Sequence, residues 1–383
     1  MQVLFVIDSL FTGGSEYSTL LYARWLQQQG YAVRIVLLKV KNPSYDPLAF
    51  GLQAAYVTVL QPGGFISRLL QLQKILRYYH PDLVHSVLTA SNFNCRVLRM
   101  VSRKFLHIES LVNQPYSAER LQDKKLKPWK IRILQFFDRL THTLGVDAFH
   151  ANSEAVALHY CREVGVSSSR ITVIPRGRED NPFVTQREQV REALLDELQI
   201  QEPCLVLINT GRHEHQKGQD VLLRAVASLS SAFNWYLLIA GREGAETAQL
   251  RHLVQQYQLE QRVRFLGHRT DVPRLLAASD LFVFPSRFEG MPGALIEACA
   301  AGLPVVCTNL PCMKEVVEPG VNARVFDAEE VSGLAQHIEV LLNDSSLRQQ
   351  MGKQSLQLFT SKFQVASIHG RMEQLYQQVL SRN

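Results

Sequence analysis

Residues 280–307, DLFVFPSRFEGMPGALIEACAAGLPVVC, decide the fold of this chain. The run Leu281–Phe284 is apolar and has the length of a strand, and the polar residues after it are typical of a loop. Gly293–Ala301 have the apolar and small residues of a buried helix, and a Gly and a Pro separate them from a second apolar run, Val305–Cys307. This order predicts a βαβ unit whose helix begins at the carboxyl edge of a parallel sheet.

Two glutamates of this stretch lie eight residues apart, Glu289 in the loop and Glu297 in the helix. A carboxylate inside an apolar helix needs a partner or a ligand hydroxyl, because burying it unpaired is costly. The first backbone N–H groups of the helix, on Gly293, Ala294 and Leu295, predict an anion site. Taken alone, the Glu-Gly-x-Pro loop is also typical of a solvated turn.

The length and composition indicate a globular protein with more than one domain. The chain has 383 residues, of which 46% are hydrophobic and 20% charged. The six cysteines form no Cys-x-x-Cys pair, so we expect reduced thiols rather than disulfides or a zinc site. The apolar start MQVLFVIDSL lacks a basic flank and a cleavage site, and we interpret it as a buried strand rather than a signal peptide.

Strands and helices alternate along the chain, which predicts doubly wound parallel sheets. The polar, turn-rich residues 176–182, RGREDNP, predict a linker, after which the pattern restarts. In the first half, Gly13-Gly14 lie between a strand and a helix, where backbone can approach a ligand closely. They do not form G-x-G-x-x-G, so a dinucleotide site has little support, and a plain turn is the alternative.

In the second half, Leu205–Thr210 predict a strand that ends in the loop GRHEHQKG. Arg212 and Lys217 of this loop are expected at the same sheet edge as the two glutamates, where two cations suit a diphosphate and two carboxylates suit sugar hydroxyls. The cations would do the charge work that Mg²⁺ does elsewhere. His213 and His215 lack a third ligand, so we expect surface residues and no metal site.

These motifs resemble those of the retaining GT-B glycosyltransferases of family 4. The resemblance is strongest from about residue 170 to 320 and rests on GRHEHQKGQDVLLRA, IAGREG, FLGHRTDVPRLLAASDLFVFPSRFEGMPGALIEACAAGLPVVCT and the spacing of the two glutamates. It implies two Rossmann-like domains facing a central cleft. Residues 1–176 would bind the acceptor, residues 183–363 would bind the nucleotide-sugar donor, and a helix at about 364–383 would cross back to the first domain.

The resemblance also implies roles for individual residues. Arg212 and Lys217 would hold the diphosphate, Glu289 would lie beside the donor sugar, and Glu297 would bind the ribose hydroxyls. The other implied donor-binding residues are Gly13, Gly14, Gly241, His268, Gly290, Met291, Pro292, Gly293, Ala294 and Leu295.

One part of the family pattern is missing. Many members carry a histidine at the end of a first-domain strand, whereas the corresponding position here is Asn113, and His107 lies too early. The usual second histidine after the PDLVH motif, which ends in His85, is Val87. His85 and Asn113 are therefore the candidates on the acceptor side.

The predicted activity is transfer of a hexose-type sugar from a UDP-sugar or GDP-sugar to an acceptor hydroxyl, with retention and without a metal or cofactor. Cell-surface polysaccharide or glycolipid synthesis is the expected setting. A sugar-nucleotide epimerase on the same fold and a non-catalytic sugar-nucleotide-binding scaffold are the alternatives. A glycogen-phosphorylase-like enzyme would need a longer chain and a pyridoxal-phosphate lysine.

The charge distribution bears on the acceptor. Residues 1–180 carry 22 Lys and Arg against 13 Asp and Glu, whereas residues 181–383 carry 19 against 22. Residues 96–139 are basic and contain Trp129, Phe136 and Phe137, which suits an anionic membrane surface or a lipid-linked glycan acceptor, although a solvated helix face is equally typical. We expect no nucleic-acid partner and a cytoplasmic protein, with peripheral attachment to the inner face of the membrane as a further possibility.

Overall fold

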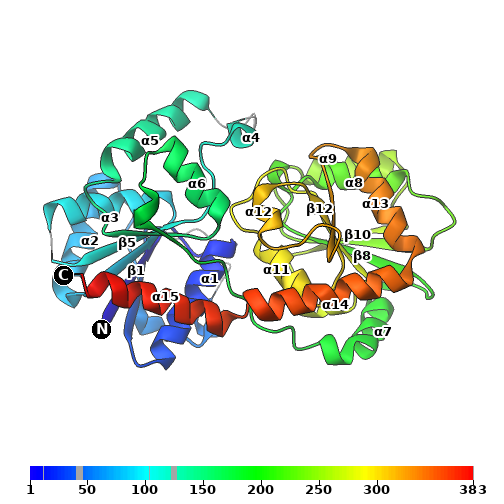
Figure 1. Ribbon diagram of the computed structural model, residues 1–383, viewed down its shortest axis with the longest axis horizontal. Helices are drawn as coiled ribbons and strands as arrows, with labels where there is room; N and C mark the ends of the chain where they lie inside the picture. Colours follow the sequence, from blue (N-terminus) through cyan, green and yellow to red (C-terminus); the bar gives the residue numbers. More distant parts are fainter. Residues whose placement is uncertain (12, 40–45, 103, 122–126, 383) are drawn as a thin grey trace. The chain divides into compact units, whose positions relative to one another are not determined.

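The computed structural model describes the whole chain except residues 12, 40–45, 103, 122–126 and 383. The described residues form two compact units (Figure 1). The first unit comprises Met1–Gly177 and Ala366–Asn383, and the second comprises Arg178–Val365. The boundary between the units falls within the polar stretch 176–182.

The first unit contains a seven-stranded parallel sheet in the order β3-β2-β1-β4-β5-β6-β7. Its strands are β1 (Gln2–Ile7), β2 (Ala32–Leu37), β3 (Val57–Val59), β4 (Leu83–Val87), β5 (Leu106–Leu111), β6 (Ala148–Ala151) and β7 (Ile171–Val173). Its helices are α1 (Gly14–Gln28), α2 (Phe65–Tyr79), α3 (Thr89–Val101), α4 (Ala118–Leu121), α5 (Pro128–Thr141), α6 (Glu154–Glu163) and α15 (Val365–Leu380). The central strands are buried on both faces, as expected of a parallel sheet between helices.

Helix α15 completes the core of the first unit, although it is the last helix of the chain. Ile368, Met372, Leu375 and Tyr376 pack with residues of β1, β2 and α1 in one apolar cluster. Burial of these side chains removes apolar surface from water and so holds the end of the chain on the first sheet.

The second unit contains a six-stranded parallel sheet in the order β10-β9-β8-β11-β12-β13. Its strands are β8 (Leu205–Thr210), β9 (Trp235–Ala240), β10 (Val263–Gly267), β11 (Leu281–Phe284), β12 (Val305–Thr308) and β13 (Ala323–Phe326). Its helices are α7 (Arg187–Leu198), α8 (Gln219–Ala227), α9 (Thr247–Gln256), α10 (Val272–Ala277), α11 (Gly293–Ala300), α12 (Pro311–Lys314), α13 (Val331–Asn343) and α14 (Ser345–Lys362). Helices α8, α9 and α13 share one apolar cluster with the sheet, and α11 packs against α14 on another part of the unit.

The predicted βαβ unit is confirmed, because β11, α11 and β12 follow one another and the two strands pair in parallel. Some elements differ from the prediction. Strand β13 was not predicted, because ARVF places an arginine among few apolar residues. Residues 121–140 have the pattern of one long basic helix or of a helix pair broken near Pro128, and α5 begins at Pro128 as the second alternative predicts; α4 ends at Leu121, and residues 122–126 lie outside the described part.

All six cysteines are free thiols, as the sequence predicted. Among the described residues, no helix combines the length and the apolar character needed to span a bilayer.

Candidate functional site

The candidate site lies where the strand order of the second sheet reverses. Strand β8 has β9 on one side and β11 on the other, so the connections after β8 and β11 leave the sheet in opposite directions. Open parallel sheets bind ligands in the crevice beyond the carboxyl ends of the strands at such a point. The loop after β8 contains Arg212 and Lys217, and the loop after β11 contains Glu289.

A set of hydrogen bonds ties these two loops together. Arg287 forms a bidentate ion pair with Asp220 at 2.9 Å for both N–O contacts, and its guanidinium donates to the carbonyl of His215 at 2.7 Å. The Gln216 amide donates to the carbonyl of Phe288 at 2.9 Å. Burial alone raises the pKa of Asp220, but the hydrogen bonds and charge of Arg287 outweigh it and lower the pKa. These contacts hold the loops after β8 and β11 in a fixed position relative to each other.

Close backbone packing at this edge depends on two glycines. Gly218 has a φ of +61°, and a Cβ there would lie 2.0 Å from the carbonyl oxygen of Pro285. A Cβ on Gly241 would lie 1.9 Å from the carbonyl oxygen of Gly211. A larger residue at either position would push the loops apart.

Lys217 and Glu289 form an ion pair across the two loops. The distance from Nζ to Oε1 is 2.5 Å, and the side chains are 16% and 9% exposed. The Lys217 ammonium also lies 5.1 Å from the centroid of the Phe284 ring. A cation held by one carboxylate and one aromatic face has a defined position but keeps some accessible surface.

The start of α11 offers backbone donors at the same edge. Pro292 is the N-cap residue, and the N–H of Leu295 donates to its carbonyl at 3.1 Å. The prediction of three free donors is therefore wrong for Leu295. Among the described residues, the N–H groups of Gly293 and Ala294 have no acceptor, so they remain available to an anion.

Glu297 on α11 is paired with a residue that sequence reasoning missed. Its Oε1 accepts a hydrogen bond from Nε of Arg178 at 2.6 Å, with 3% of the arginine side chain and 33% of the glutamate exposed. A Cβ on Gly293 would lie 1.9 Å from Nη2 of Arg178, so the glycine makes room for the guanidinium. The backbone of Arg178 is fixed by hydrogen bonds to Phe363 and Val365.

Further polar groups surround the loops. Arg212 is half-buried and, among the described residues, takes part in no ion pair. The hydroxyls of Thr210 at the end of β8 and Ser286 after β11 are buried without a hydrogen-bond partner in the described part of the chain. Buried hydroxyls are usually satisfied, so these two are candidates to bind water or ligand.

The expectation that His213 lies on the surface is wrong. It is 1% exposed, its ring packs against Phe265, and its Nδ1 lies 3.0 Å from the Thr247 hydroxyl. His215 is half-buried and His268 is exposed. Among the described residues, no three His, Cys, Asp or Glu side chains are grouped so that they could hold a metal ion.

The remaining candidates lie in the first unit. Gly13 is the N-cap of α1, which starts at Gly14, and Asn113 follows β5 and is half-buried. His85 on β4 is 3% exposed. Both ring nitrogens of His85 are engaged inside the unit, by Tyr376 at 2.5 Å and by Ser110 at 2.7 Å. Its role toward a sugar stays a prediction.

The hydrogen bonds of His85 belong to a series in which each group's role as donor or acceptor can be assigned. Nε2 of His150 lies 2.9 Å from the carbonyl of Ile174, which can only accept, so this nitrogen donates. Nδ1 of the neutral ring then accepts from the Ser110 hydroxyl at 2.8 Å. Ser110 in turn accepts from Nε2 of His85, and Nδ1 of His85 accepts from Tyr376. Burial lowers the pKa of His150 to about 4, which keeps the ring neutral.

The predicted residues thus divide between the two units. The structure brings together Lys217 and Glu289, and it carries Arg212 and Glu297 on neighbouring elements of the same sheet edge. Arg178 and Arg287 were missed. A signal for Arg287 was its place within the loop before Glu289, whereas Arg178 gave none because it lies 119 positions from its partner.

Two family models match the chain. The model "Glycosyl transferases group 1" matches residues 190–357, and "Glycosyltransferase Family 4" matches residues 12–181. Together they cover most of both units. The chain therefore belongs to the group 1 glycosyltransferases, and its two parallel-sheet units have the GT-B fold.

Two of the similar proteins are named for lipopolysaccharide or O-antigen synthesis. The chain is 26% identical to the lipopolysaccharide core biosynthesis glycosyltransferase LpsE of Rhizobium meliloti, over 61% of this chain and 64% of that protein. It is 34% identical to the O-antigen chain mannosyltransferase B of Escherichia coli, over 36% of this chain and 37% of that protein. The alignments thus span less than two thirds of these relatives.

Solved structures show the same fold over the whole chain. Anabaena Alr3699/HepE, solved with UDP and glucose, has a TM-score of 0.82 at 20% identity, covering 99% of this chain and 100% of that one. Sucrose-phosphate synthase of Thermosynechococcus elongatus has a TM-score of 0.84 at 18% identity and covers all of both chains.

Proposed function

We propose that this protein is a glycosyltransferase that moves a hexose-type sugar from a nucleoside-diphosphate sugar to an acceptor hydroxyl. The ion pair between Lys217 and Glu289, at the switch point of the second sheet, is the observation that carries the proposal. It joins a cation suited to phosphate and a carboxylate suited to sugar hydroxyls at one edge. The relatives named for lipopolysaccharide and O-antigen synthesis support the same class of reaction.

The second unit would bind the donor. Arg212, Lys217 and the free N–H groups of α11 would hold the diphosphate, and Glu297 would accept hydrogen bonds from the ribose hydroxyls. Arg178 would fix the carboxylate of Glu297 without touching the donor itself. The other proposed donor contacts are Gly13, Gly14, Gly241, His268 and the loop Gly290–Leu295.

The chemistry would depend on charge that develops as the sugar leaves. Departure of the diphosphate builds negative charge on the leaving oxygen, which Lys217 and Arg212 would stabilise. The acceptor hydroxyl would attack from the face that the diphosphate leaves, so that the configuration is retained, and the leaving phosphate oxygen would take its proton. Two cationic side chains supply the charge that a metal supplies in other transferases. The proposed base is uridine or guanosine.

The acceptor would be a glycan or a lipid-linked glycan, in polysaccharide or glycolipid synthesis on the cytoplasmic side of the membrane. The net positive charge of residues 1–180 favours an anionic acceptor for the first unit.

A donor-turnover assay tests the proposal. The full chain is incubated with a panel of UDP-sugars and GDP-sugars, with and without a glycan or glycolipid extract, and release of nucleoside diphosphate is measured. We expect Lys217→Ala to slow release about 10²–10³-fold, as loss of one charge-stabilising group does in other enzymes. Lys362→Ala is the matched control, because this lysine forms an exposed ion pair with Glu318 in the same unit.

The outcomes separate the alternatives. Release of diphosphate at equal rates from the wild type and Lys217→Ala would contradict the proposed site. A changed sugar nucleotide without release of diphosphate would indicate an epimerase. Binding of a sugar nucleotide without turnover, even with acceptor extracts, would favour the scaffold.

A further inference from the structure

Helix α5, Pro128–Thr141, packs Ile131 and Leu134 half-buried against an apolar cluster of the first unit, but it also carries a second, exposed apolar face. Its one fully buried residue is an acid, Asp138, at 4% exposure. Five of its large apolar side chains are instead exposed by about half: Trp129, Ile133, Phe136, Phe137 and Leu140, at 57%, 48%, 58%, 51% and 53%. Surface helices normally turn such residues toward the core, so this exposed face needs an explanation.

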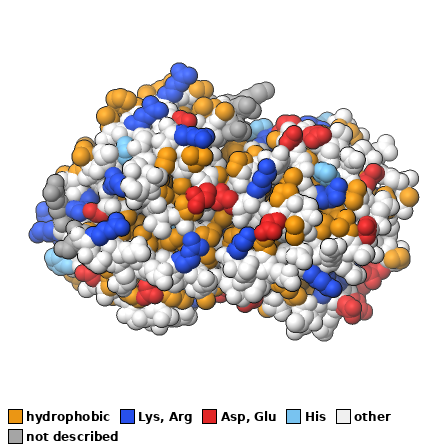
Figure 2. All heavy atoms as spheres, in the orientation of Figure 1, with side chains coloured by type: hydrophobic (Ala, Val, Ile, Leu, Met, Phe, Trp, Pro, Cys, Tyr) orange, Lys and Arg blue, Asp and Glu red, His pale blue; other side chains and the backbone are white. Residues whose placement is uncertain are grey.

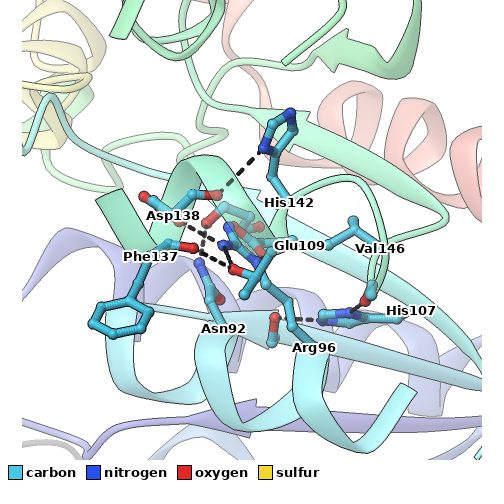
Figure 3. A network of polar contacts seen from close by, with 12 residues as sticks. Asn92, Arg96, His107, Glu109, Phe137, Asp138, His142 and Val146 are labelled. Carbon is cyan, nitrogen blue, oxygen red and sulfur yellow. Dashed lines mark hydrogen bonds and ion pairs between the residues drawn. The ribbon is translucent and has the colours of Figure 1, made fainter. Parts of the chain in front are cut away.

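Asp138 is buried because it completes an ion network in the interior of the first unit (Figure 3). Its Oδ1 lies 2.5 Å from Nη1 of Arg96 on α3, and its Oδ2 accepts from the Tyr116 hydroxyl at 2.5 Å. The same guanidinium holds Glu109 on β5 through two hydrogen bonds, at 2.5 and 2.6 Å. In Figure 3 the ring of Phe137 points away from this network. The network and the packing of Ile131 and Leu134 fix the inner side of α5, so that the five exposed apolar residues on its other side face outward.

The exposed apolar residues form one stripe. At 3.6 residues per turn, the five positions fall within an arc of roughly 100°. Lys130 lies beside this arc on one side, and Arg132 and Arg139 lie on the other. All three cations are exposed, and residues 127–144, which the structure describes fully, contain no acid besides Asp138. Figure 2 shows hydrophobic side chains beside Lys and Arg over α5, at the upper left.

We propose that α5 docks the protein on an anionic lipid surface, with the stripe in the headgroup layer and the flanking cations on the lipid phosphates. An apolar face with aromatic residues and a cationic border is the pattern of helices that lie in the membrane interface. The charge favours this occupant over a second copy of the chain, because two such cationic faces repel each other. The buried network holds α5 in place, so docking requires no ordering of the helix.

Helix α2 shows that exposed apolar residues alone do not make this surface. It also exposes apolar side chains, with Ile66 at 72% and Leu70 at 62%. It buries Leu72 toward the core, as an ordinary surface helix does. Its exposed apolar residues do not form a single narrow stripe bordered by cations. It therefore provides matched control positions in the same unit.

Co-sedimentation of the full chain with lipid vesicles tests the proposal without any nucleotide, so its result is independent of the donor site. One set of vesicles is phosphatidylcholine, and in the other a third of the lipid is phosphatidylglycerol. We expect binding to the anionic vesicles only, weakened by high salt. Lys130→Ala with Arg132→Ala should weaken binding about thirtyfold, since each cation near an anionic surface contributes about fivefold. Phe136→Ser with Phe137→Ser should weaken it at least tenfold.

The control double variant, Ile66→Ser with Leu70→Ser on α2, should bind as the wild type does, and thermal unfolding should show that all variants fold. Equal binding to both vesicle types, no binding to either, or full binding by the α5 variants would overturn the proposal. A dimer of the full chain in light scattering that the Phe136 and Phe137 substitutions dissociate, without a change in sedimentation, would assign the face to a second copy. Loss of sedimentation in the α2 variant would also contradict the assignment to α5.

Discussion

The carboxyl edges of the two sheets carry polar side chains of opposite kinds. In the first unit, His85, Ser110 and His150 are buried, neutral and hydrogen-bonded to one another. In the second unit, Lys217 and Glu289 are charged and partly accessible. Both sheets are parallel and open, so the architecture does not cause the difference. The comparison teaches that the side chains at the edge, rather than the sheet itself, are what support the proposal that the second unit binds the donor.

Acidification should destabilise the first unit more than the second, and this is the largest effect that we expect. Burial lowers the pKa of His107, His150 and His369, all in the first unit, to about 4. The unfolded chain has histidine pKa values of about 6.5, so between these values the unfolded state binds more protons. The stability that the neutral rings contribute is therefore complete above about pH 6.5 and falls as the pH drops toward 4. At pH 5 the loss is about 2 kcal/mol for each histidine.

Hydrogen exchange measured at pH 7 and pH 5, corrected for the intrinsic rates, checks this. Peptides of β5 and β6 should lose more protection than peptides of β8 and β9. Burial also lowers the pKa of His213, His268 and His337 in the second unit, but less far, so that unit should lose stability in the same direction but by less. An equal loss of protection in both units would contradict the conclusion that buried neutral histidines stabilise mainly the first unit.

Removal of Arg96 should destabilise the first unit without weakening the donor site. Arg96→Met leaves Glu109 and Asp138 buried without their cation, which should cost about 3–5 kcal/mol of unfolding free energy. Denaturant unfolding measures the loss, and nucleotide affinity of the folded fraction should not change. Arg99→Met is the control, because its ion pair with Asp147 is partly exposed and should be worth about 1 kcal/mol or less. If both variants lost the same unfolding free energy, the buried network would contribute no more stability than the partly exposed ion pair.

Arg178→Lys should have the smallest effect and should act on the second unit. A lysine cannot reproduce the hydrogen bond from Nε to Glu297, so the carboxylate should lose its fixed position. Nucleotide affinity should fall about twentyfold, near the lower end of the range for a hydrogen bond to a charged group. Calorimetric titration measures it, with Arg274→Lys, at an ion pair with Glu197 in the same unit, as control. An unchanged affinity would mean that Arg178 does not position Glu297 for the ligand.

The sequence predicted most of the regular structure of the second unit. The strands Leu205–Thr210 and Leu281–Phe284 have the predicted bounds, because each is an apolar run that a polar residue, Gly or Pro ends. Strand β13 lacks such a run. In the first unit, Gly13-Gly14 were predicted to lie between a strand and a helix, but α1 already begins at Gly14, because the small residues there gave no periodic signal.

The candidate site was only partly predictable. Lys217 and Glu289 each follow an apolar run that reads as a strand of one sheet, so their approach at one edge could be predicted. Arg178 could not be predicted, because its polar, turn-rich surroundings are typical of an exposed linker although the side chain is 3% exposed. His213 was misplaced for a related reason, since Phe265, which packs against its ring, lies on β10, more than 50 residues later in the chain and two strands from β8 in the sheet.

Binding of a nucleoside diphosphate to the second unit is the central claim, and thermal unfolding with UDP, GDP and ADP tests it most directly. A nucleotide at 100 times its Kd should stabilise the wild type by about 2.7 kcal/mol, which is visible as a rise in Tm. Lys217→Ala and Glu297→Ala should lose this rise, whereas Lys362→Ala should keep it. The nucleotide that stabilises the wild type would identify the base. If no nucleotide raises the Tm of the wild type, or if Lys217→Ala and Glu297→Ala respond as the wild type does, the assignment of the donor site is wrong.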